Sequence, residues 1–207
     1  MHDIPGTAAG ERSRRAEKAS LRRRVVAARA AMSDAARLSA ARLIREYVLE
    51  MPEVSAAGTI AAYYSIGTEP DTHALVFALW KRGSYVVLPV LLPDGELDWA
   101  SYEGPDSLVP GPHGLLQPAD PVRGPGTVAR ADIVLVPALA VDERGYRLGR
   151  GGGSYDRALA RVGEQVPTIA LLYDDELLPS VPTEAHDQRV RVVARPSAGL
   201  TFTGAPR

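Results

Sequence analysis

The chain has 207 residues, of which 45% are hydrophobic, and its 24 basic and 25 acidic side chains leave a net charge of −1. This length suits one sizeable domain or two small ones, and the near-neutral charge gives no general bias toward nucleic acid or acidic lipid. The absence of cysteine excludes disulfides, thiolate nucleophiles and cysteine-ligated metals. No apolar run reaches the roughly 18 to 20 residues needed to span a bilayer, and no secretory signal is evident, so we expect a cytoplasmic protein with no membrane partner.

Three helices are predicted in the first half of the chain, because apolar residues recur there at spacings of three and four. Residues 1–14 lack this periodicity and are expected to form a disordered lead to a single domain at 15–197. Ser33 is expected to cap the second helix, and Asp71 or Thr72 the third. The apolar positions of these helices are Leu21, Val25, Ala28 and Met32; then Ala41, Ile44, Val48 and Met51; then Leu75, Val76, Leu79 and Trp80, before Gly83.

Short apolar runs predict the strands. The strongest is 132–137, which is apolar almost throughout and is therefore expected to be buried on both faces. Strands alternate with helices, which predicts an α/β fold with a mostly parallel sheet and helices on both faces. Residues 104–126 are expected to form a long ordered loop, and 198–207 a tail. Other strands are expected at 59–64, 85–89, 97–102, 168–172 and 189–194, with a helix at 155–162.

The most informative stretch runs Arg147-Leu148-Gly149-Arg150-Gly151-Gly152-Gly153-Ser154-Tyr155-Asp156-Arg157, between a strand and a helix. Glycines let the backbone approach a ligand closely and turn successive N–H groups toward an anion. The arginines would supply counter-charge, and Asp156 a carboxylate for a metal. We therefore predict a phosphate site here, although glycine-rich runs are often plain flexible loops and this one matches neither the P-loop nor the Rossmann pattern.

This stretch, with the preceding Val136-Pro137-Ala138-Leu139-Ala140-Val141-Asp142, closely resembles the signature of the 5-formyltetrahydrofolate cyclo-ligase family. Three further pieces agree with that family in order and spacing, namely Lys18 to Arg22, Tyr64 to Glu69, and Val181 to Asp187. The resemblance implies a three-layer α/β/α sandwich, similar to the group that contains sugar-phosphate isomerases and CoA transferases. It also implies ATP- and Mg²⁺-dependent cyclisation of 5-formyltetrahydrofolate to 5,10-methenyltetrahydrofolate, which yields ADP and phosphate.

The resemblance assigns roles to individual residues. Arg150 is implied to be catalytic, because it would stabilise charge on the transferring phosphoryl group. Asp156 and Asp187 are implied to hold Mg²⁺. The implied ATP contacts are Lys18, Arg22, Arg147, Leu148, Gly149, Arg150, Gly151, Gly152, Gly153, Ser154 and Tyr155. The implied folate contacts are Tyr64, Glu69, Arg150, Gly151, Gly152, Gly153 and Ser154.

Each of these side chains also has a structural explanation. Lys18 and Arg22 fit a solvated basic helix face, and Glu69 fits a turn before a helix. Both aspartates fit capping or helix-dipole roles, and Tyr155 fits a core aromatic. Ser154 departs from the family, whose members usually carry a tyrosine there, and is expected to cap the following helix instead.

Two other functions stay open on the sequence alone. One is a sugar-phosphate isomerase of the same fold group, which would need neither ATP nor Mg²⁺. The other is a non-catalytic relative that binds RNA through its basic N-terminal helix, although nucleic acid is not the expected partner because aromatic residues are not interleaved with the basic ones. A monomer or weak dimer is expected.

Overall fold

A computed structural model describes residues 8–204 of the chain, with side chains from Gly10 onward. Its α-helices are α1 (Ala8–Ala31), α2 (Asp34–Glu50), α3 (Pro52–Ala56), α4 (His73–Lys81) and α5 (Ser154–Leu159). Short 3-10 helices are η1 (Pro105–Ser107), η2 (Pro112–Gly114), η3 (Pro125–Arg130) and η4 (Asp174–Glu176). The strands are β1 (Thr59–Ala61), β2 (Tyr85–Leu91), β3 (Leu97–Ser101), β4 (Leu108–Pro110), β5 (Leu116–Pro118), β6 (Ile133–Pro137), β7 (Ala140–Asp142), β8 (Arg147–Leu148), β9 (Thr168–Leu171), β10 (Leu177–Leu178), β11 (Val192–Arg195) and β12 (Gly199–Phe202).

The largest sheet has seven strands in the order β12-β11-β9-β6-β1-β2-β3. The five inner strands are parallel, and each edge strand pairs antiparallel with its neighbour. The predicted α/β fold with a mostly parallel sheet is confirmed. Strand order reverses between β1 and β6, because β2 follows on one side of β1 while β6, β9 and β11 follow on the other. In open α/β sheets ligands bind beyond the carboxyl ends of the strands at such a reversal.

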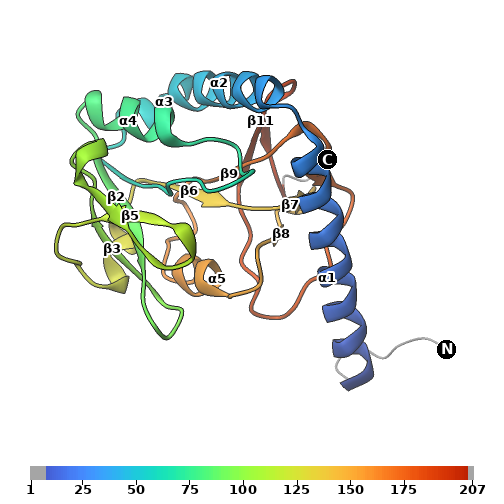
Figure 1. Ribbon diagram of the computed structural model, residues 1–207. Coiled ribbons are helices and arrows are strands. Elements are labelled where there is room, and N and C mark those ends of the chain that lie inside the picture. Colours follow the sequence, from blue (N-terminus) through green and yellow to red (C-terminus); the bar gives the residue numbers. More distant parts are fainter. Residues whose placement is uncertain (1–7, 205–207) are drawn as a thin grey trace.

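Two cores cover the faces of this sheet. Along β6, Ile133 and Leu135 pack toward α2, α3 and α4, whereas Val134 and Val136 pack toward α5 and η3. All four side chains are at most 1% exposed, as predicted for a strand buried on both faces. Figure 1 shows α2, α3 and α4 above the sheet and α5 below it.

The second face carries less helix than predicted. The helix expected at 155–162 ends at Leu159. Beyond it the hydrogen bonds join residues three apart instead of four, from the N–H of Arg161 to Ala158 O and from the N–H of Val162 to Leu159 O. That face is completed by η3 and by the small sheet β10-β7-β8.

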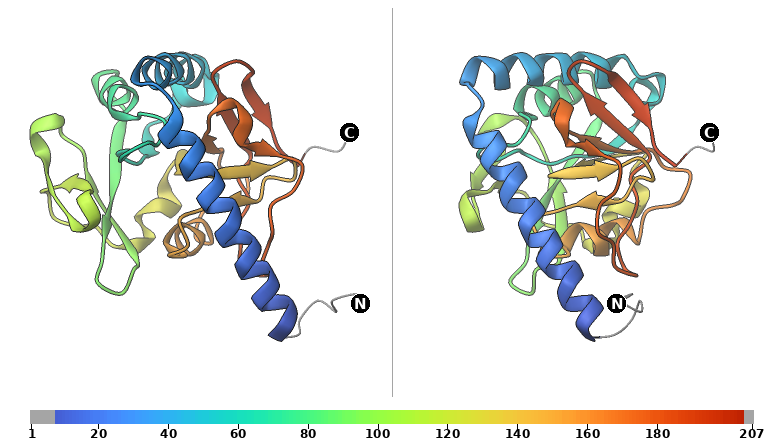
Figure 2. Two further views of the ribbon diagram at one scale, coloured as in Figure 1. Left: turned by 45° about the vertical axis from the view of Figure 1, so that its right-hand side comes forward. Right: turned by 90° about the vertical axis from the view of Figure 1, so that its right-hand side faces the viewer.

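Helix α1 begins at Ala8, so the disordered lead expected at 1–14 is wrong for residues 8–14, while 1–7 lie outside the described residues. Alanine, glutamate and arginine are strong helix formers, and they extend the helix without an apolar stripe. Figure 2 shows α1 crossing the side of the molecule next to β7. Val25 packs there with Leu139 and Leu148.

The buried stripe of α1 differs from the predicted one. Val25 is buried as expected, but Arg29 takes the place of the exposed Ala28 and is only 1% exposed itself. A charged residue can occupy such a position when it is fully paired, and Arg29 is paired with Glu176.

Two segments expected to lack regular structure contain strands. The 104–126 loop includes the antiparallel pair β4 and β5. The expected tail at 198–207 contains β12, which pairs with β11 and packs Leu200 against the core; residues 205–207 lie outside the described part. All three strands are short, so sequence periodicity gives little signal for them.

The two predicted helix caps, those of α2 and α4, have different outcomes. Ser33 Oγ accepts from the N–H of Ala36 at 3.2 Å, so the predicted cap of α2 is confirmed. At α4 the N-cap residue is Thr72, but its hydroxyl donates to Tyr63 O instead of capping the helix. Asp71 Oδ1 accepts from the N–H of His73 at 2.7 Å.

Candidate active site

The segments that follow β1 and β6 meet where the strand order reverses. Glu69 follows β1, and its Oε2 accepts from the N–H of Ile66 at 3.0 Å, which holds the turn. Its other oxygen accepts from the Arg150 guanidinium at 3.0 Å. Glu69 has a side chain 10% exposed and Arg150 one 57% exposed. The predicted folate residue and the predicted catalytic arginine are therefore in direct contact.

The glycine loop, residues 149–153, has a backbone that needs its glycines. Gly151 has φ +105° and Gly153 has φ +69°, both in the left-handed region that other residues rarely adopt. Gly153 is the N-cap of α5, and no side chain caps the helix there. The expectation that Ser154 caps α5 is wrong, because Ser154 is the first helical residue and its hydroxyl donates to Gly95 O at 2.6 Å.

Arg147 and Asp156 form an ion pair beneath the loop. Arg147 Nη2 donates to Asp156 Oδ1 at 2.9 Å, and their side chains are 4% and 16% exposed. Burial lowers the pKa of Arg147, while the carboxylates of Asp156 and Asp187 raise it in part. Asp156 also accepts from the N–H of Gln188 at 3.2 Å, so it joins α5 to the loop that carries Asp187.

Lys18 and Arg22 of α1 reach the same region. Lys18 Nζ contacts Asp187 Oδ2 at 2.8 Å and Glu184 Oε2 at 3.0 Å. The hydrogen bond from Lys18 lowers the pKa of Glu184. Arg22 Nε donates to Gly149 O at 2.9 Å. These two residues therefore do not form a solvated basic face of the helix, because Lys18 is buried and Arg22 is bonded to the glycine loop.

The two predicted metal ligands have different surroundings. Asp156 is paired with Arg147, whereas Asp187 lies in a cluster with Glu184 and His186, whose ligand atoms are all within 4.8 Å of one another. Gln188 links them, since it follows Asp187 in the chain and bonds to Asp156. Carboxylate oxygens are the donors that Mg²⁺ takes, together with phosphate oxygens and water.

Three other predicted contact residues, Tyr64, Leu148 and Tyr155, lie in different surroundings. The ring of Tyr64 stacks on His73, with centroids 3.8 Å apart. Leu148 is 1% exposed and packs with Val25, so only its backbone can meet a ligand. Tyr155 packs against both cores, and burial raises the pKa of its hydroxyl. Within the described residues that hydroxyl has no hydrogen-bond partner.

A buried ion pair that the sequence analysis does not predict anchors α1. Arg29 donates to both carboxylate oxygens of Glu176, at 2.6 and 2.8 Å, and to Ala138 O at 2.8 Å. Its guanidinium lies over the ring of Tyr173, whose hydroxyl reaches Thr68 O at 3.4 Å. The signal was present in the spacing, because Arg29 continues the face of Lys18 and Arg22 at helical intervals.

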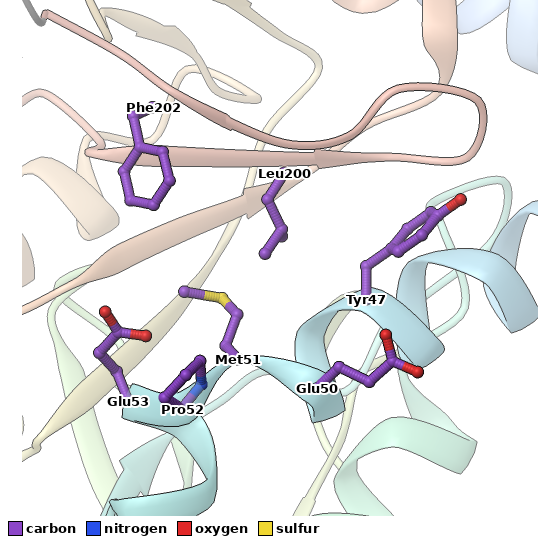
Figure 3. Close-up of a pocket in the computed structure, with 7 residues that line it drawn as sticks. All are labelled: Tyr47, Glu50, Met51, Pro52, Glu53, Leu200 and Phe202. Atoms are coloured by element: carbon purple, nitrogen blue, oxygen red, sulfur yellow. The ribbon is translucent and has the colours of Figure 1, made fainter.

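A cavity of about 350 Å³ lies elsewhere, between the end of α2, the start of α3 and β12. Figure 3 shows Leu200 and Phe202 of β12 facing Met51 across it. A second cavity of about 470 Å³ lies between α2 and α4. Neither is lined by the glycine loop, Glu69 or α1.

Comparison with known proteins identifies the family. The model of the 5-formyltetrahydrofolate cyclo-ligase family matches residues 14–196. The chain belongs to this family. Among cyclo-ligase relatives, the 5-formyltetrahydrofolate cyclo-ligase of Mycolicibacterium smegmatis is 37% identical over 188 residues, which are 88% of this chain and 95% of that protein. The Escherichia coli K12 cyclo-ligase is 34% identical over 153 residues, which are 72% of this chain and 84% of that protein.

Solved structures with the cyclo-ligase fold agree. The 5,10-methenyltetrahydrofolate synthetase of Aquifex aeolicus superposes with a TM-score of 0.78 at 26% identity, covering 92% of this chain and 94% of that one. The enzyme of the same name from Mycoplasma pneumoniae gives 0.68 at 22% identity, over 86% and 97%, a likeness of fold. Among the residues described, no helix has the length and apolar character required to cross a membrane.

Proposed function

We propose that this protein is a 5-formyltetrahydrofolate cyclo-ligase that uses ATP and Mg²⁺ to form 5,10-methenyltetrahydrofolate, with ADP and phosphate as the other products. The observation that carries the proposal is the contact between Arg150 and Glu69. It joins the glycine loop to the turn after β1 in a chain of this family. Both substrates would thus meet at the carboxyl edge of the sheet.

The loop residues fit a bound triphosphate. The backbone N–H groups of 149–153 would face the phosphates, and Arg150, more than half exposed, would reach them. Arg22 supports this loop through Gly149 O. Lys18 would contact phosphate in competition with Asp187 and Glu184, with which its ammonium is paired. The predicted ATP contacts of Arg147, Leu148 and Tyr155 would be made chiefly by backbone groups, because their side chains are largely occupied by packing or pairing.

The acidic residues suit Mg²⁺ that accompanies ATP. Asp156 and Asp187 offer hard oxygen donors, which is the ligand chemistry that Mg²⁺ requires. The ion would supply charge neutralisation for the phosphates. Arg147 pairs with Asp156 and fixes its carboxylate in place, and Lys18 does the same for Asp187. Because each carboxylate already has a cationic partner, affinity for the ion would depend on the phosphates being present too.

The folate would bind next to Glu69 and Tyr64. A carboxylate is a suitable acceptor for paired N–H donors of a pterin ring, and Glu69 is held in place by its own turn. The formyl oxygen would attack the γ-phosphorus, and the bond to ADP would break. The nitrogen at position 10 would then close the ring on the formyl carbon, and the phosphate would leave with that oxygen.

Arg150 would contribute most at the phosphoryl transfer. Phosphoryl transfer is accelerated mainly by positioning and by neutralising charge on the moving group. A guanidinium that lies between the folate turn and the glycine loop is placed to do so once its contact to Glu69 is exchanged for the phosphoryl oxygens. The cytoplasmic location and the monomer or weak dimer expected from the sequence complete the proposal.

The test is a component-omission experiment on the purified full chain. We expect 5,10-methenyltetrahydrofolate, ADP and phosphate to appear in equal amounts, and only when 5-formyltetrahydrofolate, ATP and Mg²⁺ are all present. Product without ATP would refute the proposed reaction. Absence of product from folded protein would favour the isomerase or RNA-binding alternatives, which sugar-phosphate turnover and salt-dependent RNA binding would then distinguish.

A further inference from the structure

The tip of the β2–β3 hairpin, residues 92–96, lies against the start of α5. Two side chains of α5 donate to one oxygen of this tip, since Ser154 Oγ and Arg157 Nη2 are each 2.6 Å from Gly95 O. A carbonyl oxygen has two lone pairs, so it can accept both donors at once. Both bonds therefore fasten the hairpin tip to α5 at this oxygen.

Charged contacts surround this point. Glu96 Oε1 accepts from Arg161 Nη1 at 3.0 Å, and its other oxygen lies 3.6 Å from Arg157 Nε. The two arginines are exposed or nearly so, and exposed ion pairs contribute little to stability. The two hydrogen bonds to Gly95 O, of which the one from Ser154 is part-buried, are therefore the main attachment.

The same two side chains adjoin the glycine loop. Arg157 Nη1 donates to Gly152 O at 3.4 Å, and Ser154 directly follows Gly153. The hairpin tip has its own internal bonds, from Gly95 N–H to Leu92 O and from Leu92 N–H to Glu96 O, each 2.9 Å. The hairpin tip, which has its own internal hydrogen bonds, is thus joined to the glycine loop. The glycine loop has few side chains that could fix its backbone.

We propose that Ser154 and Arg157 are positioning residues that fasten the β2–β3 tip to α5 and so fix the backbone of the glycine loop before a ligand binds. This inference rests on the proposed function. It implies that the Ser154 hydroxyl stays hydrogen-bonded to Gly95 O and does not contact ATP or folate. A loop fixed in advance loses less conformational entropy on binding. The effect therefore falls on substrate binding more than on the chemical step.

The test compares Ser154→Ala and Ser154→Thr with the wild-type chain. Ser84→Ala is a matched control, since Ser84 Oγ also donates to a backbone carbonyl, that of Ala57. Amide exchange at residues 92–96 is measured without ligands, and KM and kcat are measured with ATP and 5-formyltetrahydrofolate. We expect Ser154→Ala to raise both the exchange rate and the KM for ATP about fivefold, with kcat within about twofold of wild type. Ser154→Thr and Ser84→Ala should match wild type.

Two results would overturn the inference: unchanged exchange at the tip in Ser154→Ala, or faster exchange with unchanged KM. An inactive wild-type enzyme would instead contradict the proposed function. Calorimetric affinity for ATP would then replace KM, so that weaker binding by Ser154→Ala still supports the positioning role and equal binding still overturns it.

Discussion

Arg150 and Glu69 lie 81 residues apart in the chain, yet the guanidinium of one is 3.0 Å from the carboxylate of the other. Glu69 lies in the segment after β1, and Arg150 follows the β7–β8 pair that comes after β6, the neighbour of β1 in the sheet. Glu69 is held by its own turn, whereas Arg150 projects from a glycine loop and is more than half exposed. Arg150 is therefore the partner that can exchange this contact for a ligand.

Replacing Arg150 with alanine should slow turnover far more than it weakens ATP binding. Its charge matters most when the phosphoryl group is in transit, and removal of one such group typically costs about a hundredfold in kcat. Steady-state kinetics with ATP as the varied substrate measures both effects. Arg42→Ala is the matched control, because Arg42 is also an exposed arginine near a glutamate, Glu46, but on α2. Equal losses in kcat and ATP affinity would argue against the catalytic role.

Asp156→Asn should raise the Mg²⁺ concentration needed for half-maximal activity. Asparagine keeps an oxygen for the N–H of Gln188 but removes the charge that faces Arg147 and that would bind the proposed ion. We expect a shift on the order of tenfold, as is typical when a metal site loses a supporting carboxylate. Titration with Mg²⁺ at saturating ATP measures it, with the exposed Asp175→Asn as control. An unchanged requirement would remove Asp156 from the metal site.

Breaking the buried pair at Arg29 should destabilise the fold. Arg29→Met leaves Glu176 buried without its cation, and such losses typically cost about 3–5 kcal/mol. Urea unfolding measures the change in the free energy of unfolding. The double variant Arg29→Met with Glu176→Leu should recover most of the loss, because it removes both charges. A double variant no more stable than the single one would show that the pair is not the source of the effect.

Acid should loosen the contact between α1 and the 184–187 loop. The pKa of Glu184 is below its ordinary value of 4.5 because Lys18 bonds to its charged form. Its contribution to stability is therefore complete well above pH 4.5 and is lost as pH falls through the lower folded-state pKa. We expect wild type to be more stable than Glu184→Gln at neutral pH, and the difference to shrink on acidification. Unfolding midpoints across the pH range test this, and a difference that grows in acid would contradict it.

Much of the fold could be predicted from local patterns. Apolar runs such as 132–137 predicted the central strand, and Ser33 predicted a cap that is present. Short elements without strong periodicity were missed, including β12 and the first turns of α1. β12 depends on a tight turn that pairs it with β11, and the first turns of α1 depend on helix propensity alone.

The site could be predicted as a set of residues but not as a set of contacts. The glycine-rich motif and family resemblance named Arg150 and Glu69, yet no local pattern says that the two touch. The role of Ser154 depends on Gly95, 59 residues earlier in the chain, so its bond is a property of the folded molecule. Arg29 lies in the buried face of α1 because it is paired with Glu176, 147 residues later in the chain, and no apolar periodicity indicates such a position.

The most direct test of the account is to follow the formyl oxygen. The full-length enzyme is given ATP, Mg²⁺ and 5-formyltetrahydrofolate that carries a heavy-oxygen label in the formyl group, and the released phosphate is analysed by mass spectrometry. The account predicts that the label appears in the phosphate, one labelled oxygen for each methenyl product formed. Label found only in water, with unlabelled phosphate, would contradict direct phosphorylation of the substrate by ATP.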